Sequence, residues 1–358
     1  MPKLARDVKS YTIEAEFLGS AACEQLVTAG IPVARAFSVQ REICKMDPID
    51  SRFSLLLEDF APGSGWRQHR LLGPAAARAT LAAFARLHAF FWEGSAFWRA
   101  GGPAAAELEG AVWGSGSYWQ PAMQPAEQLE GVAAGWERHR EAFQQEFTQT
   151  EELQGVDLAT LGERLQAVVH RVGQRAHPFS EAGAGLQGFR TLIHGDAKAA
   201  NIFLRETEDQ QYQVGLIDFQ WCGFGLAATE IAHHIFVALD MSVLSYDGSA
   251  EAALLDCYYA HLLAALVEFA VASDLETAAR LLPRTTLQDQ YETAVLDMCR
   301  TVFGYHWVRI QASPAVLENN KDSLGRNSYN KSLPHAKWVV AACNRALVHN
   351  DVVCKQVR

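Results

Sequence analysis

The hydrophobic and polar positions along the chain predict a protein with few strands and many helices. Apolar residues recur at helical spacing in six segments: 4–29, 74–92, 126–147, 157–176, 249–273 and 334–348. Short runs rich in β-branched and aromatic residues predict two strands near the start of the chain, over 31–40 and 53–57. The pattern therefore indicates a mixed α+β fold in which helices dominate.

Three further apolar runs lie close together in the middle of the chain. Residues 191–193, 202–204 and 214–217 predict three short buried strands, and the charged segment 206–211 predicts a turn between the last two. The glycines of segment 221–225 predict a second turn directly after them.

Polar side chains cluster where these strands end. Gly195 permits a tight backbone path after the first strand, and Asp218 ends the third. Two carboxylates, from Asp196 and Asp218, the amide of Asn201 and the ammonium of Lys198 are therefore expected at one edge. This set suits hard-cation and phosphate chemistry, because Mg²⁺ prefers oxygen ligands and usually takes the remainder from a nucleotide.

The spacing of these residues resembles that of a known superfamily. His194-Gly195-Asp196 followed by Asn201, and then Ile217-Asp218-Phe219-Gln220, is similar to the protein-kinase-like small-molecule kinases. These include the aminoglycoside phosphotransferases, the choline kinases and the ecdysteroid-kinase-like group, and the Asp-Phe-Gln form most resembles the last. The resemblance implies a protein-kinase-like two-lobed fold, with a truncated N-lobe and hinge over 1–60 and a mostly helical C-lobe over 61–358.

The same resemblance implies roles for the central residues. Asp196 would be the base that receives the proton of the substrate hydroxyl, and Asn201 and Asp218 would hold Mg²⁺ on the phosphates of ATP. Lys198 would lie near the γ-phosphate, and His194 would orient the loop. The implied function is ATP-dependent phosphorylation of a hydroxyl group on a small molecule.

The N-lobe roles also come from the resemblance. Glu14, with Glu16 as the second choice, would pair with a lysine that binds phosphate. Asp59 and Phe60 would form the hinge that meets adenine. Glu230 falls near the position where the superfamily usually has an aspartate that braces the catalytic loop.

The superfamily's glycine-rich hairpin and strand lysine have no counterpart before the first predicted helix. Lys3, or alternatively Lys9, is the candidate for the phosphate-binding lysine. Three explanations stay open: the chain is a shortened version of a longer product, the protein binds ATP without the glycine-rich hairpin, or the fold has lost the reaction. If the fold has lost the reaction, the protein would be a non-catalytic binder of a nucleotide or small molecule. An interaction protein that binds no nucleotide is a further alternative to the kinase.

Two other features have a structural as well as a functional interpretation. Asp196 and Asp218 are common types of turn residue, and His194 is a common type of core residue. The aromatic residues within 93–125 either close over a substrate and cage a quaternary ammonium, or pin an irregular loop to the core. The packing interpretation is the more frequent one for large aromatic residues.

Composition limits the remaining possibilities. The chain has 358 residues and a net charge of −10, which argues against a nucleic-acid partner. Its seven cysteines include no Cys-x-x-Cys pair, which favours reduced thiols in the cytoplasm. No apolar signal core follows Met1, and the most apolar stretch, 261–272, is interrupted by a glutamate and is too short to span a bilayer. The sequence predicts neither the acceptor nor the oligomeric state.

Overall fold

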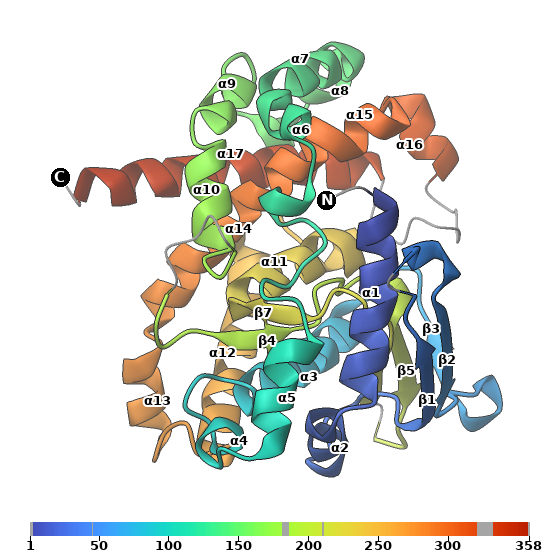
Figure 1. Ribbon diagram of the computed structural model, residues 1–358. Helices are drawn as coiled ribbons and strands as arrows, with labels where there is room; N and C mark the ends of the chain where they lie inside the picture. The colour runs from blue at the N-terminus through green and yellow to red at the C-terminus, as the bar shows by residue number, and fades with distance from the viewer. Residues whose placement is uncertain (1–2, 45, 181–185, 210, 321–331, 357–358) are drawn as a thin grey trace.

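The computed structural model describes residues 3–44, 46–180, 186–209, 211–320 and 332–356. The fold is α+β and mostly helical, as the sequence predicted (Figure 1). The strands are β1 (Ala36–Glu42), β2 (Arg52–Leu57), β3 (Arg67–Gln68), β4 (Thr191–Ile193), β5 (Ile202–Glu206), β6 (Tyr212–Leu216) and β7 (Gly223–Gly225).

The α-helices occupy both ends of the chain and most of its middle. They are α1 (Lys3–Leu18), α2 (Ala21–Thr28), α3 (Pro74–Phe90), α4 (Ala96–Arg99), α5 (Pro103–Ala111), α6 (Ala126–Glu130), α7 (Val132–Ala142), α8 (Gln144–Thr148), α9 (Leu161–Gln166), α10 (Val169–Ala176), α11 (Ala227–Ala238), α12 (Ser249–Glu268), α13 (Leu275–Leu281), α14 (Arg284–Thr301), α15 (Trp307–Ile310), α16 (Pro314–Asn320) and α17 (Leu333–Gln356). A π-helical turn, Val302–His306, joins α14 to α15.

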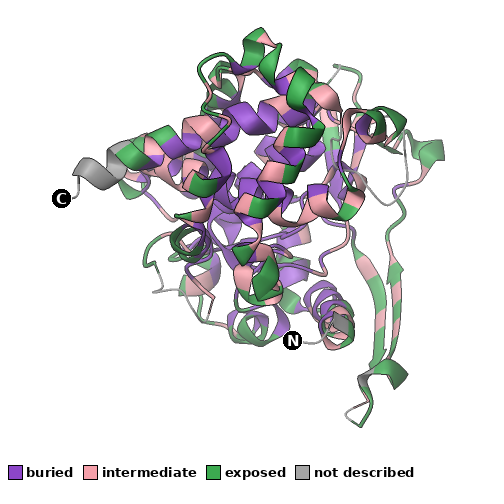
Figure 2. Ribbon diagram, turned by 90° about the horizontal axis from the view of Figure 1, so that it is seen from above, coloured by how far each residue is buried: buried purple, intermediate pink, exposed green. Residues whose placement is uncertain are grey.

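The first part of the chain is a helix beside a two-stranded hairpin. β1 and β2 pair antiparallel, with a register shift between Ala36 and Ser38. In Figure 2 the hairpin projects away from the rest of the molecule, and its residues are exposed or half-buried. A parallel bridge between Val33 and Leu216, at the end of β6, ties this part to the central strands.

The central strands form two small sheets. β3, β5 and β6 make one antiparallel sheet, and β4 pairs antiparallel with β7. The turn predicted over 221–225 is therefore wrong for residues 223–225, which form a strand, while Trp221 lies in a turn. A side chain on Gly223 would place its Cβ 2.4 Å from the carbonyl oxygen of Trp113, so this close pairing requires glycine.

Three of the predicted helices are interrupted. The segment 4–29 is two helices, since Ser20 caps α2 by accepting a hydrogen bond from the Cys23 amide at 3.2 Å. Segment 126–147 contains α6, α7 and most of α8, and Gly131 ends the first of these. Segment 157–176 contains α9 and α10. Apolar spacing alone does not show such breaks, because the apolar face continues across them.

The core lies between α3, α11, α12 and α14. Every residue of α11 is buried. Within the described residues, α12 alone has the length and apolar composition of a membrane span, and 39% of its apolar window is buried inside the protein. Buried Leu255, Tyr258 and Leu262 on α12 belong to the same core as Leu81 and Phe84 on α3.

Candidate active site

The loop after β4 is held by one buried carboxylate. Glu230, in the first turn of α11, accepts hydrogen bonds from the amides of His194 at 2.8 Å and Gly195 at 2.7 Å. Its Oε2 also lies 3.0 Å from Nε2 of His88, whose Nδ1 lies 2.7 Å from the Tyr258 hydroxyl. Burial alone would raise the pKa of Glu230, but these hydrogen bonds and the nearby imidazoles outweigh it and lower the pKa. Glu230 therefore braces the loop, the role that the resemblance implied for an aspartate near this position.

Gly195 is required by the shape of this loop. Its φ is +83°, and a Cβ there would lie 2.1 Å from the carbonyl oxygen of Trp221 and 2.8 Å from the amide nitrogen of Ser117. No other residue type fits without moving the backbone. The tight turn brings Asp196 beside the segment that follows β6.

The four predicted central residues meet in space. Lys198 Nζ contacts Asp196 Oδ2 and lies 3.9 Å from Asp218 Oδ2. Asn201 Nδ2 donates to the backbone oxygen of Asp196 at 2.9 Å and to its Oδ2 at 3.3 Å. The amide of Asp196 lies 3.3 Å from Nδ1 of His194, whose Nε2 lies 2.8 Å from the carbonyl oxygen of Ile217.

The electrostatics of this cluster follow from burial and charge. Burial raises the pKa of Asp218, and the Asp196 carboxylate raises it further, while Lys198 opposes both effects. Burial would lower the pKa of Lys198, but Asp196 and Asp218 outweigh it, so the pKa is raised. The ammonium therefore stays charged between two carboxylates that repel each other.

Asp218 has two features that fit a cation ligand. It is a non-glycine residue with φ of +67°, a strained conformation that is frequent at functional sites. Its Oδ1 is buried and has no hydrogen-bond partner among the described residues. Because a buried carboxylate oxygen without a partner is costly, the site suits a bound cation with Asp218 and Asn201 as protein ligands.

Helix α1 contacts the segment after Asp218. Glu14 Oε1 accepts a hydrogen bond from the amide of Phe219 at 3.1 Å, and the rings of Phe17 and Phe219 lie 4.9 Å apart. Ser10 Oγ donates to Gln220 Oε1 at 3.2 Å. Burial and, to a lesser extent, Asp218 raise the pKa of Glu14 to about 7. The carboxylate predicted to pair with a lysine forms no ion pair with one among the described residues, and instead holds the Asp-Phe-Gln segment.

The other residues predicted to bind the nucleotide are more scattered. The side chain of Lys3 lies outside the described residues, and Lys9 Nζ lies 4.4 Å from the ring centroid of Trp113. The second-choice carboxylate, Glu16, lies 3.8 Å from the exposed Arg41 guanidinium. Asp59 is exposed, while Phe60 is buried with its ring 5.4 Å from that of Phe203 on β5. Phe60 thus packs beside β5, which begins directly after Asn201, and β6, which ends just before Asp218.

The aromatic residues near this loop mostly pack. Trp92, Trp113 and Trp119 are buried, which supports the structural interpretation of the aromatic segment. Trp113 stacks on Trp221, with their ring centroids 5.8 Å apart. Sequence reasoning missed Arg6, which lies against the rings of Tyr118 and Trp221, because no local signal links residues so far apart in the chain.

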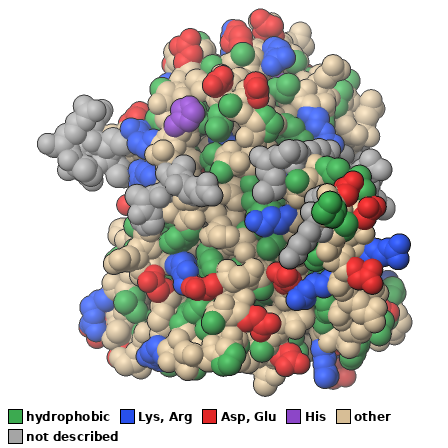
Figure 3. All heavy atoms as spheres, viewed as in Figure 1, with side chains coloured by type: hydrophobic (Ala, Val, Ile, Leu, Met, Phe, Trp, Pro, Cys, Tyr) green, Lys and Arg blue, Asp and Glu red, His purple; other side chains and the backbone are tan. Residues whose placement is uncertain are grey.

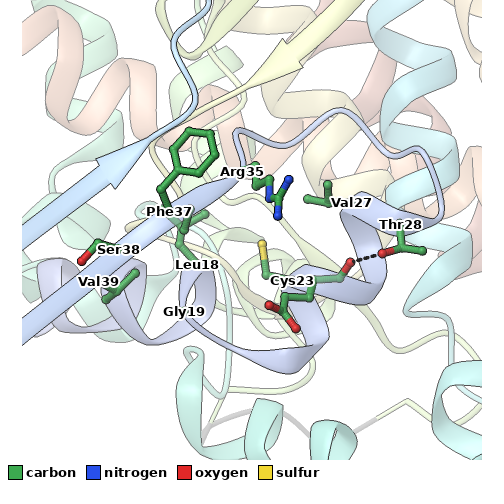
Figure 4. A pocket seen from close by; sticks show the side chains of 11 residues that line it. Leu18, Gly19, Cys23, Val27, Thr28, Arg35, Phe37, Ser38 and Val39 are labelled. Atoms are coloured by element: carbon green, nitrogen blue, oxygen red, sulfur yellow. Dashed lines mark hydrogen bonds between the residues drawn. The ribbon is translucent and has the colours of Figure 1, made fainter.

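A separate pocket of 630 Å³ lies between the end of α1, α2 and β1 (Figure 4). It is lined by Leu18, Cys23, Val27, Arg35 and Phe37 among others. None of the residues predicted for the active site lines it, so it does not mark the site of chemistry.

The loop after β4 and the segment after β6 thus bring Asp196, Lys198, Asn201 and Asp218 together. The sequence model of the ecdysteroid kinase-like family matches residues 34–270. The chain belongs to this family. The matched region contains the four central residues and Glu230, whereas Lys3, Glu14 and the rest of α1 precede it.

Two solved structures of small-molecule kinases are also similar to this ecdysteroid kinase-like protein. A microcompartment-associated aminopropanol kinase is 16% identical with a TM-score of 0.41, and the match covers 95% of this chain and 82% of that one. An ethanolamine kinase from Plasmodium vivax is 11% identical with a TM-score of 0.33, and the match covers 91% and 72%. No curated protein sequence matches the chain.

Proposed function

We propose that this protein is a phosphotransferase that uses ATP and Mg²⁺ to phosphorylate a hydroxyl group of a small molecule. The observation that carries the proposal is the meeting of Asp196, Lys198, Asn201 and Asp218, with a buried oxygen of Asp218 that has no partner among the described residues. Membership of the ecdysteroid kinase-like family supports a small-molecule kinase.

In this proposal, each central residue has a distinct task. Asp196 orients the acceptor hydroxyl and takes its proton late in the reaction, while Lys198 neutralises phosphate charge. Asn201 and Asp218 would hold Mg²⁺, which supplies charge neutralisation on the phosphates when bound. Glu230 and Glu14 act indirectly, since they position the loop and the Asp-Phe-Gln segment.

We further propose that one part of the chain contributes to nucleotide binding and another binds the acceptor. Residues 1–60 would form a partial N-lobe and hinge, with Asp59 and Phe60 near adenine and Lys3 near the phosphates. Residues 61–358 would form the C-lobe that binds the acceptor. The six cysteines whose side chains are described are free thiols, which supports placing the protein in the cytoplasm.

Mg²⁺-dependent consumption of ATP across a panel of hydroxylated metabolites tests the proposal. We expect at least one compound to stimulate ATP consumption, and the stimulation to disappear when Mg²⁺ is chelated. Consumption that no compound stimulates would contradict the proposal.

One observation favours a second candidate, a nucleotide-binding protein without turnover. Glu14 forms no ion pair with a lysine among the described residues, and Lys9 of α1 lies against the ring of Trp113 instead. This candidate predicts that ATP with Mg²⁺ raises the melting temperature while no acceptor is phosphorylated. An interaction protein on the same fold would show no such shift.

A further inference from the structure

A pocket of 530 Å³ adjoins the catalytic loop and has an unusual charge for this protein. Tyr118 lines the pocket, and the same residue donates its backbone N–H to the carbonyl oxygen of Gly195 at 3.4 Å. The Tyr118 ring also lies 4.8 Å from that of Trp221, three residues after Asp218. Tyr118 therefore connects the pocket to the catalytic loop.

Two guanidinium groups line this pocket, and none of its described lining residues is acidic. Figure 3 shows acidic and basic side chains interspersed over one face of the molecule, and the whole chain carries a net charge of −10. A pocket lined by arginines alone among charged residues is therefore a local exception. It disfavours a cationic ligand and favours an anionic one.

Arg6 is fixed and nearly buried, with 7% of its surface exposed. Its guanidinium carbon lies 4.9 Å from the ring centroid of Tyr118 and 5.8 Å from that of Trp221. Its Nη1 donates to the carbonyl oxygen of Met123 at 3.3 Å, and its Nε and Nη2 lie 3.4 and 3.3 Å from Oδ1 of the half-exposed Asp7. These long bonds leave part of the five-donor guanidinium for a ligand.

Arg309 supplies a second, more exposed cation at the end of α15. It is exposed, its Nη1 donates to the Tyr305 hydroxyl at 3.2 Å, and its guanidinium lies 5.9 Å from the Tyr305 ring centroid. It forms no ion pair with a carboxylate in the part of the chain that the structure describes. Tyr118 and Tyr305 line the pocket together with these two arginines. The pocket therefore combines two cationic side chains with two aromatic rings.

The same contacts argue against an ammonium cage at these rings. The cation-binding faces of Tyr118 and Trp221 are already used by Arg6, and that of Trp113 by Lys9. A quaternary ammonium would have to displace a guanidinium whose charge repels it.

We propose that the acceptor carries an anionic group, such as a carboxylate, sulfate or phosphate ester, that binds between Arg6 and Arg309. Its apolar or aromatic body contacts Tyr118 and Tyr305, and its hydroxyl extends toward Asp196. The assignment of this ligand as the acceptor rests on the phosphotransferase function proposed above, whereas the preference for an anion does not.

Three probes with the same ring and the same hydroxymethyl group test the charge preference: 4-(hydroxymethyl)benzoate, 1,4-benzenedimethanol and 4-(hydroxymethyl)benzylamine. Their dissociation constants are measured by titration calorimetry or ligand-observed NMR without nucleotide. We expect the benzoate to bind about tenfold more tightly than the diol, and the amine to bind least, because a charge-assisted hydrogen bond contributes about 1.5 kcal/mol. The preference should weaken as salt is added.

Arg309→Gln tests the site itself, because this exposed side chain can be changed without opening the core. We expect the substitution to weaken benzoate binding about threefold to tenfold and to leave the diol unchanged. Arg280→Gln, an exposed arginine on α13 outside the pocket, is the matched control and should change neither constant.

Equal binding of the three probes, no binding of the benzoate at millimolar concentration, or no effect of Arg309→Gln would each overturn the inference. Failure of the phosphotransferase proposal would look different. A protein that binds the benzoate in this way and phosphorylates no acceptor would contradict that proposal and leave the anion site standing. Turnover of neutral or cationic acceptors without a charge preference would contradict the anion site and support the phosphotransferase proposal.

Discussion

At the scale of single residues, the candidate site depends on carboxylates held in unfavourable surroundings. Asp218 has a left-handed backbone conformation and a buried oxygen with no partner in the described part of the chain, and burial and then the neighbouring Asp196 raise its pKa. Such strain is stable only when the rest of the fold enforces it. The hydrogen bond from the Phe219 amide to Glu14 and the contacts of Lys198 provide that support.

Asp218→Asn should abolish the stabilisation that ATP and Mg²⁺ give together. The substitution keeps the shape of the side chain but removes the charge that attracts the metal ion. We expect a rise in melting temperature with ATP and Mg²⁺ for the unchanged protein and little or none for the variant, measured by thermal shift. Asp240→Asn, a half-buried aspartate that caps a turn elsewhere, is the control. An equal rise in Asp218→Asn would show that this carboxylate does not hold the metal.

Glu14 should make stability depend on pH. Its pKa is about 7 in the folded protein and 4.5 when unfolded, so folding takes up a proton between these values. The contribution of Glu14 to stability is therefore highest below about pH 4.5, falls as the pH rises to about 7, and stays low above that. Glu14→Gln removes the charge and should stabilise the protein by at most about 3 kcal/mol above pH 7, with no gain below pH 4.5.

Urea unfolding of Glu14→Gln and the unchanged protein at several pH values measures this difference. Glu24→Gln, an exposed glutamate on α2, is the control and should show no such dependence. A gain that is the same at every pH would contradict the burial of an ionisable Glu14.

At the scale of elements, one carboxylate joins β4, α3 and α11. Glu230 accepts the His194 and Gly195 amides and contacts His88, and all four groups are buried. Glu230→Ala should lower the free energy of unfolding by about 3–5 kcal/mol, because it leaves buried donors without an acceptor. Urea unfolding measures this loss.

Glu268→Ala is the comparison for that substitution. This glutamate pairs with Arg86 at 2.6 Å on the surface and is half-exposed, so its removal should cost less than about 1 kcal/mol. If the two substitutions destabilise the protein equally, Glu230 does not brace the loop.

The elements that sequence reasoning predicted well are those with local signals. The strand before Asp196, the strand after Asn201 and the loop between them follow from apolar runs and Gly195, and the structure has β4 and β5 there. The pairing of β4 with β7 was missed because Gly-Phe-Gly has the composition of a turn, and only the close approach to Trp113 explains it. The breaks within the helical segments were missed because their apolar faces continue across them.

At the scale of the whole molecule, the long-range contacts decide what the site can do. Glu14 and Phe219 are separated by 205 residues, and no pattern in the sequence predicts that a glutamate on α1 bonds the Phe219 amide instead of a lysine. Figure 1 shows α1 lying between the β1–β2 hairpin and the rest of the protein. Through α1, the part of the chain before residue 60 is connected to the segment that carries Asp218.

The measurement that most directly tests phosphoryl transfer is mass spectrometry of an acceptor incubated with ATP and Mg²⁺. We expect a phosphorylated product with the unchanged protein, and its rate of formation should fall about 10²- to 10⁴-fold in Asp196→Asn, because the base is lost while the side chain keeps its shape. The melting temperature of the variant should stay close to that of the unchanged protein. A folded Asp196→Asn variant that forms the product at an undiminished rate would contradict the account.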